Sequence, residues 1–536
     1  MRRLFAVIFL LAAPLAANEL SYRNLQSGFA GTTTPIFDHG IHGEGQIIAI
    51  LDTGVDWDTC PFIEADGSRP PINPTLASDN EDLSRRKIVA YDFLYSCAEY
   101  PGALGCDDPN DPAAYDNHGH GTHAAASAAG DRGTPIAHDY GDSIAPGAQL
   151  IVQDAGFIGG DACSQRPGIG CPVNLTPILA QAYRQGARID SNSWGDRQGV
   201  PAPLPPPTGN YPQSAHDVDA FIWSHPDFLV VFNTGNNGSL GTAPPGSLSA
   251  PGCAKDTLQV GGTRDANQYD DDVLSSFTLF GPTRDGRIKP DLVGPAWVLA
   301  GDAKVISHGQ TCGMTFQPGT SWASPTIAGS AALVRQYYIA GYYPTGTPVP
   351  ADRMTPSAAL LKATLIAAAR RVEWLNTTSG EVATKPLPSY EQGFGFPVLD
   401  DVLYFPGDAA RLRAFDVTPG VAAGETARWE FTVRPGTPLK AVLVWTDPPG
   451  ASLVNDLDLH VTDPSGTSQW GNEALHPGQP DRVNNVEGVS IAQPLAGTYI
   501  VTVSANRLGV GPRQGYALVV TGDLIEGQLR VRAARH

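Results

Sequence analysis

The sequence predicts an α/β protein with a parallel sheet, followed by an all-β region. Up to about residue 407, short apolar runs that suit buried strands alternate with helical patterns, which is the signature of a parallel sheet. After that point, short segments with alternating polar and apolar residues are separated by turn residues, which is typical of a β-sandwich. At 536 residues the chain exceeds what one hydrophobic core usually serves, so we expect two domains.

The expected elements of the first part alternate along the chain. Strands are expected at 46–51, 88–93, 149–153, 188–190, 228–233 and 257–260, and helices at 120–129, 177–185, 214–224, 322–336 and 356–371. In open sheets of this kind, ligands bind at the carboxyl ends of the strands. Further strands are expected at 412–417, 427–433, 440–446, 458–462, 498–504 and 516–521. We therefore expect an α/β domain at 18–407, a β-sandwich or jelly-roll domain at 408–524 and a solvated basic tail at 525–536.

The N-terminus has the pattern of a secretory signal peptide. Residues 1–17 contain two arginines, a mostly apolar stretch and a final Ala-Ala pair, and the apolar part is too short for a membrane span. No later stretch is long enough to span a bilayer. We expect a secreted protein, extracellular or periplasmic, that is a monomer. A net charge of −19 argues against nucleic acid as a partner.

Seven cysteines in an exported chain predict three disulfides and one leftover thiol. Two pairs would each close a short loop rich in Gly or Pro, and a third would join two loops of the first domain. The expected pairs are Cys97–Cys106, Cys163–Cys171 and Cys253–Cys312. Cys60 is then left as a free thiol.

The stretch from Gly319 to Pro325 is the centre of the functional interpretation. It places Ser321 at the start of an Ala-rich helix, and Pro325 suits the first turn, where a missing N–H costs nothing. Free N–H groups and the positive end of the helix dipole stabilise negative charge there. A hydroxyl nucleophile also needs a base, and the base needs an orienting acid. Without such partners, Ser321 would be read as an ordinary N-cap.

Two earlier motifs carry suitable partners. Asp52 begins an Asp-Thr-Gly motif directly after an apolar run, and His120 begins a His-Gly-Thr-His motif at the start of a predicted helix. The order Asp, His, Ser is one of the three known for the catalytic triad on unrelated folds. Asp56 is a rival for Asp52, and His118 and His123 are rivals for His120.

These motifs resemble those of the subtilisin-like serine proteases. Asp-Thr-Gly, His-Gly-Thr-His and Gly-Thr-Ser-x-Ala-x-Pro match the active-site motifs of that family over roughly residues 30–400, and the likeness continues into the C-terminal β domain of its KP-43-like subgroup. The resemblance implies a secreted serine endopeptidase acting on proteins or peptides. In it Ser321 would be the nucleophile, His120 the base and Asp52 the acid that orients the base. The resemblance selects His120 because the catalytic histidine of the family is the first in its motif.

The resemblance also implies an oxyanion donor and a substrate-binding edge. The side-chain amide of Asn236 would act beside the backbone N–H of Ser321. The substrate-binding residues would be Ser193, Trp194, Gly195, Gly235 and Asn237. An extended peptide would add a strand here through main-chain hydrogen bonds. The family resemblance implies broad cleavage with a preference for large apolar P1 residues. A buried core tryptophan is the alternative for Trp194, and a turn residue with left-handed backbone is the alternative for Asn237.

No cofactor is implied for the chemistry, but structural calcium is, because calcium stabilises many members of the family. Calcium takes several carboxylate and carbonyl oxygens. Candidate ligands are Asp456, Asp458 and Asp481, with a second acidic cluster at 270–272, and each cluster also suits a solvated turn.

The sequence departs from the family pattern at its N-terminal end, and it bears on two alternative functions. The segment 18–51 is too short for the inhibitory pro-segment usual in the family. A catalytically silent binding or adhesion relative is the alternative function, although such relatives usually lose a triad residue. An α/β-hydrolase would need Gly-x-Ser-x-Gly and the order Ser, acid, His, and the sequence has neither.

Overall fold

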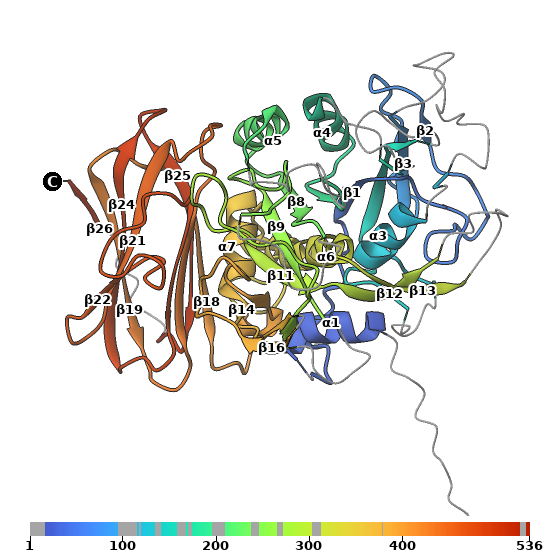
Figure 1. Cartoon of the computed structure of the whole chain (residues 1–536). Helices are drawn as coiled ribbons and strands as arrows, with labels where there is room; N and C mark the ends of the chain where they lie inside the picture. The colour runs from blue at the N-terminus through green and yellow to red at the C-terminus, as the bar shows by residue number, and fades with distance from the viewer. Residues whose placement is uncertain are drawn as a thin grey trace, which may run out of the picture.

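A large mixed sheet flanked by helices and a two-sheet β region make up this computed structural model (Figure 1). The residues it describes are 17–29, 31–94, 115–116, 119–133, 141–157, 168–169, 174–195, 210–236, 246–264, 272–302, 312–377, 379–525 and 532–535. No helix among these residues is both long and apolar enough to cross a membrane.

The central strands of the large sheet are parallel and fully buried. Its order is β16-β15-β10-β9-β8-β7-β1-β4-β3-β2, with β11 beside β9. The parallel strands are β1 (Ile47–Asp52), β2 (Ile72–Asn73), β3 (Ile88–Phe93), β4 (Gln149–Asp154), β7 (Ile189–Asn192), β8 (Leu229–Asn233), β9 (Leu258–Thr263) and β11 (Leu292–Pro295). The edge carries β10 (Val273–Leu274), β15 (Trp374–Thr377) and β16 (Gly380–Ala383). All six strands predicted for this part are confirmed, with ends shifted by a few residues at most.

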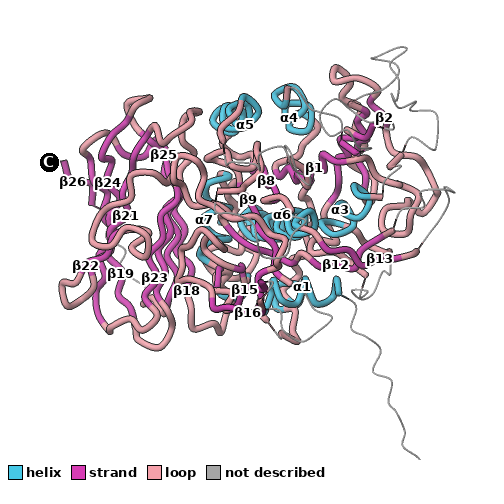
Figure 2. The backbone as a smooth tube through the Cα atoms, in the orientation of Figure 1, coloured by secondary structure: helices cyan, strands magenta, loops and turns pink. Residues whose placement is uncertain are grey.

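Helices cover both faces of this sheet (Figures 1 and 2). On one face α4 (Leu175–Arg184) and α5 (Gln213–Ser224) share an apolar cluster with Ala49 and Leu51 of β1. On the other, α3 (His120–Ala129), α6 (Thr320–Ile339) and α7 (Ala358–Ala367) share a larger cluster with Ile48 and Ile50. The alternation of side chains along a strand therefore sends successive β1 residues into two different cores. The five predicted helices are confirmed.

Small residues allow α6 to lie at the centre of the molecule. Its side chains are buried from Thr320 to Tyr338, so it has no solvent-facing stripe. A Cβ at Gly329 would lie 2.8 Å from the carbonyl oxygen of Ala128 in α3. Glycine at this position is therefore what lets the two helices approach each other.

The C-terminal residues form two packed antiparallel sheets, as predicted. One has the order β18-β25-β20-β23 and the other β22-β21-β24-β19-β26. Their strands are β18 (Arg411–Val421), β19 (Glu425–Val433), β20 (Leu439–Val444), β21 (Asn455–Thr462), β22 (Ser468–Trp470), β23 (Val486–Ile491), β24 (Gly497–Leu508), β25 (Gln514–Gly522) and β26 (Arg532–Arg535). In β25, Leu518 and Val520 point into the sandwich core, whereas Ala517 and Val519 join the core that contains α7. The first of these sheets is therefore apolar on both faces and joins the two parts of the molecule.

Both ends of the described chain form regular structure. The tail expected to be solvated contributes β26, which pairs with residues 425–428 of β19, because the exposed edge of β19 offers unpaired backbone groups. At the other end, α1 (Ala17–Ser27) packs against β12 (Trp297–Gly301). The strand β12 forms a hairpin with β13 (Met314–Pro318), which leads directly into α6.

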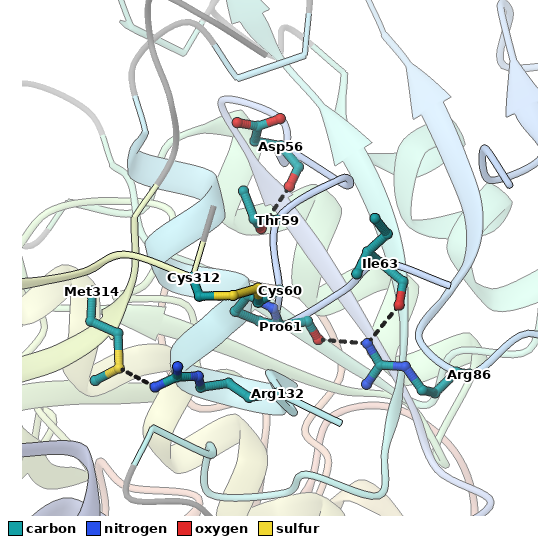
Figure 3. The surroundings of a disulfide bond; sticks show 9 residues. All are labelled: Asp56, Thr59, Cys60, Pro61, Ile63, Arg86, Arg132, Cys312 and Met314. Atoms are coloured by element: carbon teal, nitrogen blue, oxygen red, sulfur yellow. Dashed lines mark hydrogen bonds between the residues drawn. A yellow bond between two sulfur atoms is a disulfide. The ribbon is translucent and has the colours of Figure 1, made fainter. Parts of the chain in front are cut away.

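The disulfide pattern corrects the prediction from spacing. Cys60 is bonded to Cys312, with Cα atoms 4.9 Å apart, so the expected Cys253–Cys312 pair and the free Cys60 are wrong (Figure 3). Cys253 is buried instead, and its thiol donates to the carbonyl oxygen of Asn210 at 2.7 Å. Cys97, Cys106, Cys163 and Cys171 lie outside the described residues.

The Cys60–Cys312 bond ties the loop after β1 to the strand before α6. Around it, Arg86 donates to the carbonyl oxygen of Ile63 at 2.9 Å, and Arg132 contacts the sulfur of Met314 at 3.3 Å (Figure 3). The loop that follows Asp52 and the strand that precedes Ser321 are thus held by a covalent bond and by flanking hydrogen bonds.

Candidate active site

Asp52 is the last residue of β1, and its carboxylate is bonded to His120. The Nδ1 atom of His120 lies 2.7 Å from Oδ1 of Asp52. Asp52 is only 1% exposed, whereas the side chain of His120 is 31% exposed. The backbone N–H of Thr53 donates to the same Asp52 oxygen at 2.8 Å. A buried carboxylate therefore holds an imidazole whose other edge faces solvent.

Two glycines allow this approach of β1 and α3. A Cβ at Gly121 would lie 2.0 Å from the carbonyl oxygen of Gly54, and Gly54 itself has φ +92°. A side chain at Gly121 would not fit in the space, and the backbone conformation of Gly54 favours glycine. The backbone N–H of Gly121 also donates to Oγ1 of Thr53 at 2.9 Å. The glycines of Asp-Thr-Gly and His-Gly-Thr-His thus bring Asp52 and His120 together.

Asp116 is a supporting residue that the sequence reasoning missed. Its Oδ1 accepts hydrogen bonds from Thr53 Oγ1 and from the N–H of Gly119, both at 2.8 Å. Its Oδ2 accepts from the N–H and hydroxyl of Thr122 at 2.7 and 2.5 Å. One buried carboxylate thereby fixes the two turns that carry Asp52 and His120. The only sequence signal is an acidic residue four positions before His120.

The electrostatic surroundings separate His120 from its rival His123. Burial lowers the pKa of His120, but the charge of Asp52 and its hydrogen bond outweigh burial, so the pKa lies above the ordinary value. Burial lowers the pKa of His123 to about 4. At that pKa the ring is neutral at pH 7, and its Nε2 lies 3.2 Å from the carbonyl oxygen of Thr315. His118 lies outside the described residues, and Asp56 lies in the turn beyond Gly54, where its N–H donates to Thr122.

Ser321 lies in the first turn of α6, one residue after its start. The N-cap is Gly319, so Ser321 is not the cap of this helix. Its Oγ donates to the carbonyl oxygen of Ser193 at 3.3 Å. The ring of His120 packs against the ring of the next residue, Trp322, with centroids 4.8 Å apart. Asp52, His120 and Ser321 therefore come from β1, α3 and α6 to one edge of the sheet.

Pro325 explains a second contact between Ser321 and Ser193. The proline lies inside α6, beyond the first turn where it was expected, and has no N–H for the carbonyl four residues earlier, that of Ser321. The hydroxyl of Ser193 donates to that carbonyl at 2.6 Å instead. The segment after β7 is thus fixed to the first turn of α6.

Asn236 places an amide beside the first turn of α6. Its Oδ1 accepts from the N–H and the hydroxyl of Thr320 at 2.8 and 2.9 Å, which leaves Nδ2 for another acceptor. A Cβ built on Gly319 would lie 3.7 Å from both Asn236 Nδ2 and the backbone N of Ser321. Gly235, with φ +97°, makes the turn between β8 and Asn236. Two N–H donors therefore face one small space.

The expected substrate-binding residues lie at the same edge where the structure describes them. Ser193, Trp194 and Gly195 follow β7. The indole of Trp194 is partly buried; its Nε1 donates to Asn192 Oδ1 at 3.1 Å, and its ring packs edge-on against Phe232. The core alternative for Trp194 therefore holds for one side of its ring, and its role in substrate binding stays a prediction. Asn237 lies outside the described residues.

Among the expected calcium ligands, Asp456, Asp458 and Asp481 already have protein partners, whereas residues 270 and 271 of the second cluster lie outside the described residues, so calcium binding stays a prediction. Arg482 is hydrogen-bonded to Asp456 at 3.3 Å and also to Asp458. Oδ2 of Asp481 accepts from the amides of Asn472 and Asn484, both at 2.7 Å. An arginine and two amides thus take the oxygens that a cation would need. Within the described residues, no group of three or more His, Cys, Asp or Glu side chains could hold a metal ion.

A parallel sheet with Asp, His and Ser at its carboxyl edge is the arrangement of serine hydrolases with that residue order. The chain belongs to the subtilase family: the Peptidase_S8 model, described as Subtilase family, matches residues 43–395. The KP-43-like subgroup stays a prediction.

Several curated proteins are similar to this chain. It is 26% identical over 613 residues to the Serine protease/ABC transporter B family protein tagA of Dictyostelium discoideum, covering 94% of the chain and 32% of that protein. It is 26% identical to the Thermophilic serine proteinase of Bacillus sp. (strain AK1), covering 61% of each. Bacillopeptidase F of Bacillus subtilis (strain 168) is also 26% identical, over 55% of the chain and 18% of that protein. The chain spans about a third of the length of the first of these relatives.

Solved structures also align with this chain. The serine protease of Aeromonas sobria aligns with a TM-score of 0.43 and 15% identity, over 95% of this chain and 96% of that one. Sphericase aligns with a TM-score of 0.42 and 18% identity, over 72% and 99%.

Proposed function

We propose that this chain is a secreted serine endopeptidase that hydrolyses peptide bonds through an acyl-enzyme on Ser321. The observation that carries the proposal is the 2.7 Å hydrogen bond between His120 and Asp52 beside the first turn of α6. An oriented imidazole next to a serine at a helix N-terminus is the arrangement needed to activate a hydroxyl.

In the first step, Ser321 Oγ turns from the Ser193 carbonyl toward Nε2 of His120. Such hydrogen bonds are often long or absent before substrate binds. Oγ attacks the scissile carbonyl carbon as its proton passes to Nε2, and the carbonyl π pair moves to oxygen. Asp52 holds the proton on Nδ1 and stabilises the imidazolium. The new oxyanion accepts hydrogen bonds from Asn236 Nδ2 and the N–H of Ser321.

In the second step, the oxyanion re-forms the carbonyl and the C–N bond breaks. The leaving nitrogen takes the proton from His120 and departs as an amine, which leaves an ester on Ser321. Water then attacks the ester with His120 again as base, and the collapse of that intermediate returns the proton to Ser321 Oγ. The products are a carboxylic acid and an amine, and these steps use no cofactor.

Substrate would bind as an added strand along the segment Ser193–Gly195. Backbone hydrogen bonds of this kind carry little sequence information, so we infer broad specificity. The partly buried Trp194 offers an apolar wall, which supports a preference for large apolar P1 residues. The signal-peptide pattern of residues 1–17 supports export, and we propose a monomer.

The direct test is hydrolysis of casein and of succinyl-Ala-Ala-Pro-Phe-p-nitroanilide, with and without a serine-directed fluorophosphonate. We expect hydrolysis that the inhibitor abolishes. Ser321→Ala should lower kcat on the order of 10⁶-fold, the loss measured for the nucleophile of a subtilisin. Ser330→Ala is the matched control, because Ser330 is a buried serine of the same helix whose hydroxyl only donates to the Thr326 carbonyl. Equal rates in Ser321→Ala and wild type would refute the proposal.

A further inference from the structure

The indole N–H of Trp322 is buried without a hydrogen-bond partner among the described residues. The side chain is only 2% exposed, and Nε1 donates to no described protein group. Buried tryptophans usually find an acceptor for this N–H. For comparison, the buried indole of Trp445 donates to the carbonyl oxygen of Asn455 at 2.9 Å. The N–H of Trp322 therefore calls for an explanation.

The Nε1 atom of Trp322 lies beside the same small space as the two nitrogen atoms described above. A Cβ built on Gly319 would lie 3.4 Å from Trp322 Nε1 and 3.7 Å from both Asn236 Nδ2 and Ser321 N. Three N–H groups from a side-chain amide, a backbone amide and an indole thus surround one point. The glycine at 319 leaves that point empty.

The indole packs against two histidine rings of α3. Its centroid lies 4.8 Å from that of His120 and 4.1 Å from that of His123. Because His123 is neutral, Trp322 adjoins an uncharged ring on that side. A rigid, dehydrated donor costs no reorganisation when negative charge develops nearby.

We propose that Trp322 Nε1–H is a third hydrogen-bond donor to the oxyanion formed on the scissile carbonyl. The inference rests on the proposed function, since it needs an oxyanion formed by attack of Ser321. The donor has no partner in the free protein and gains one when the oxyanion forms. An interaction made only in the transition state raises kcat and leaves KM nearly unchanged.

The test removes the N–H and keeps the ring. Trp322 is replaced by 3-benzothienylalanine, in which sulfur takes the place of the N–H, and by phenylalanine. Loss of one oxyanion donor typically lowers kcat about 10²–10³-fold, and we expect about 10²-fold for both variants because two donors remain. KM should change less than about threefold. Trp429→Phe is the matched control, a tryptophan equally buried at 2% in the sandwich, and it should keep the wild-type kcat.

A wild-type kcat in the benzothienyl variant overturns the proposal, even if Trp322→Phe is inactive, because the ring alone would then suffice. A second measurement needs no substitution at the site. In protein with ¹⁵N-labelled indoles, a peptide aldehyde that forms a tetrahedral adduct on Ser321 should shift the Trp322 indole proton downfield. An unshifted proton in a formed adduct also overturns the proposal. Failure of wild-type protein to form any adduct contradicts the proposed function instead.

Discussion

Nδ1 of His120 lies 2.7 Å from Oδ1 of Asp52, and these two residues are 68 positions apart in the chain. This contact orients the imidazole of His120. The hydroxyl of Ser321 donates instead to the Ser193 carbonyl. The proposed reaction therefore needs a rotation of the Ser321 side chain away from that carbonyl.

Replacement of Asp52 by Asn should lower kcat about 10⁴-fold, because the wrong imidazole tautomer is then held. The pH profile should change as well. His120 acts as the neutral base, so activity is lost as pH falls through its pKa. Asp52 keeps that pKa above the ordinary value of about 6.5, whereas burial alone lowers it. The acid limb of kcat/KM should lie above pH 6.5 in wild type and move to lower pH in the variant. An acid limb that stays in place would contradict the role given to Asp52.

Asn236→Ala should lower kcat about 10²–10³-fold with KM little changed, since it removes one oxyanion donor. Steady-state kinetics on the peptide anilide measure both constants. Thr320→Val should lower kcat less than Asn236→Ala does, because it removes only the hydroxyl that donates to Asn236 Oδ1. A rise in KM alone for Asn236→Ala would mean that Asn236 binds substrate in the ground state.

Peptide mapping without reduction should recover Cys60 linked to Cys312. The double variant Cys60→Ser/Cys312→Ser should lose about 2–5 kcal/mol of unfolding free energy, the usual cost of removing a native disulfide. Cys253→Ser removes a thiol that is not in this bond and is the control. Recovery of Cys253 linked to Cys312 would contradict the Cys60–Cys312 disulfide.

Lys255 and Asp447 form a fully buried ion pair, 2.5 Å apart, between the first part of the chain and the β-sandwich. Lys255 Nζ also donates to the carbonyl oxygens of Pro448 and Ser452. Lys255→Met should cost about 3–5 kcal/mol of unfolding free energy, because Asp447 is left as an uncompensated buried charge. Urea denaturation measures the loss. The exposed Lys385→Met should cost less than about 1 kcal/mol. Equal losses would show that the two parts do not depend on this pair.

The sequence was sufficient for the layers of the fold and for the position of the motifs. Runs such as Ile47–Asp52 are apolar on both faces, which only a buried strand explains, and α6 begins at a motif that places its first turn. Contacts between residues far apart in the chain could not be predicted from sequence patterns. Cys60 and Cys312 are 252 positions apart, so no spacing rule pairs them.

Polar groups were the harder part of the site to predict. Asp116 acts through two turns that meet only in the folded chain, and the unpartnered N–H of Trp322 can be recognised only once its surroundings are known. The sequence beside the expected calcium ligands also carries a competing signal, because Arg482 directly follows Asp481. An adjacent cation competes with a metal for the same carboxylates.

Reaction of wild-type protein with a fluorophosphonate, followed by mass mapping of the adduct, tests the role of the nucleophile most closely. We expect one adduct, on Ser321, which forms far more slowly in His120→Ala and Asp52→Asn. An adduct on a different serine, or none in folded wild-type protein, would contradict the proposal that Asp52, His120 and Ser321 act together.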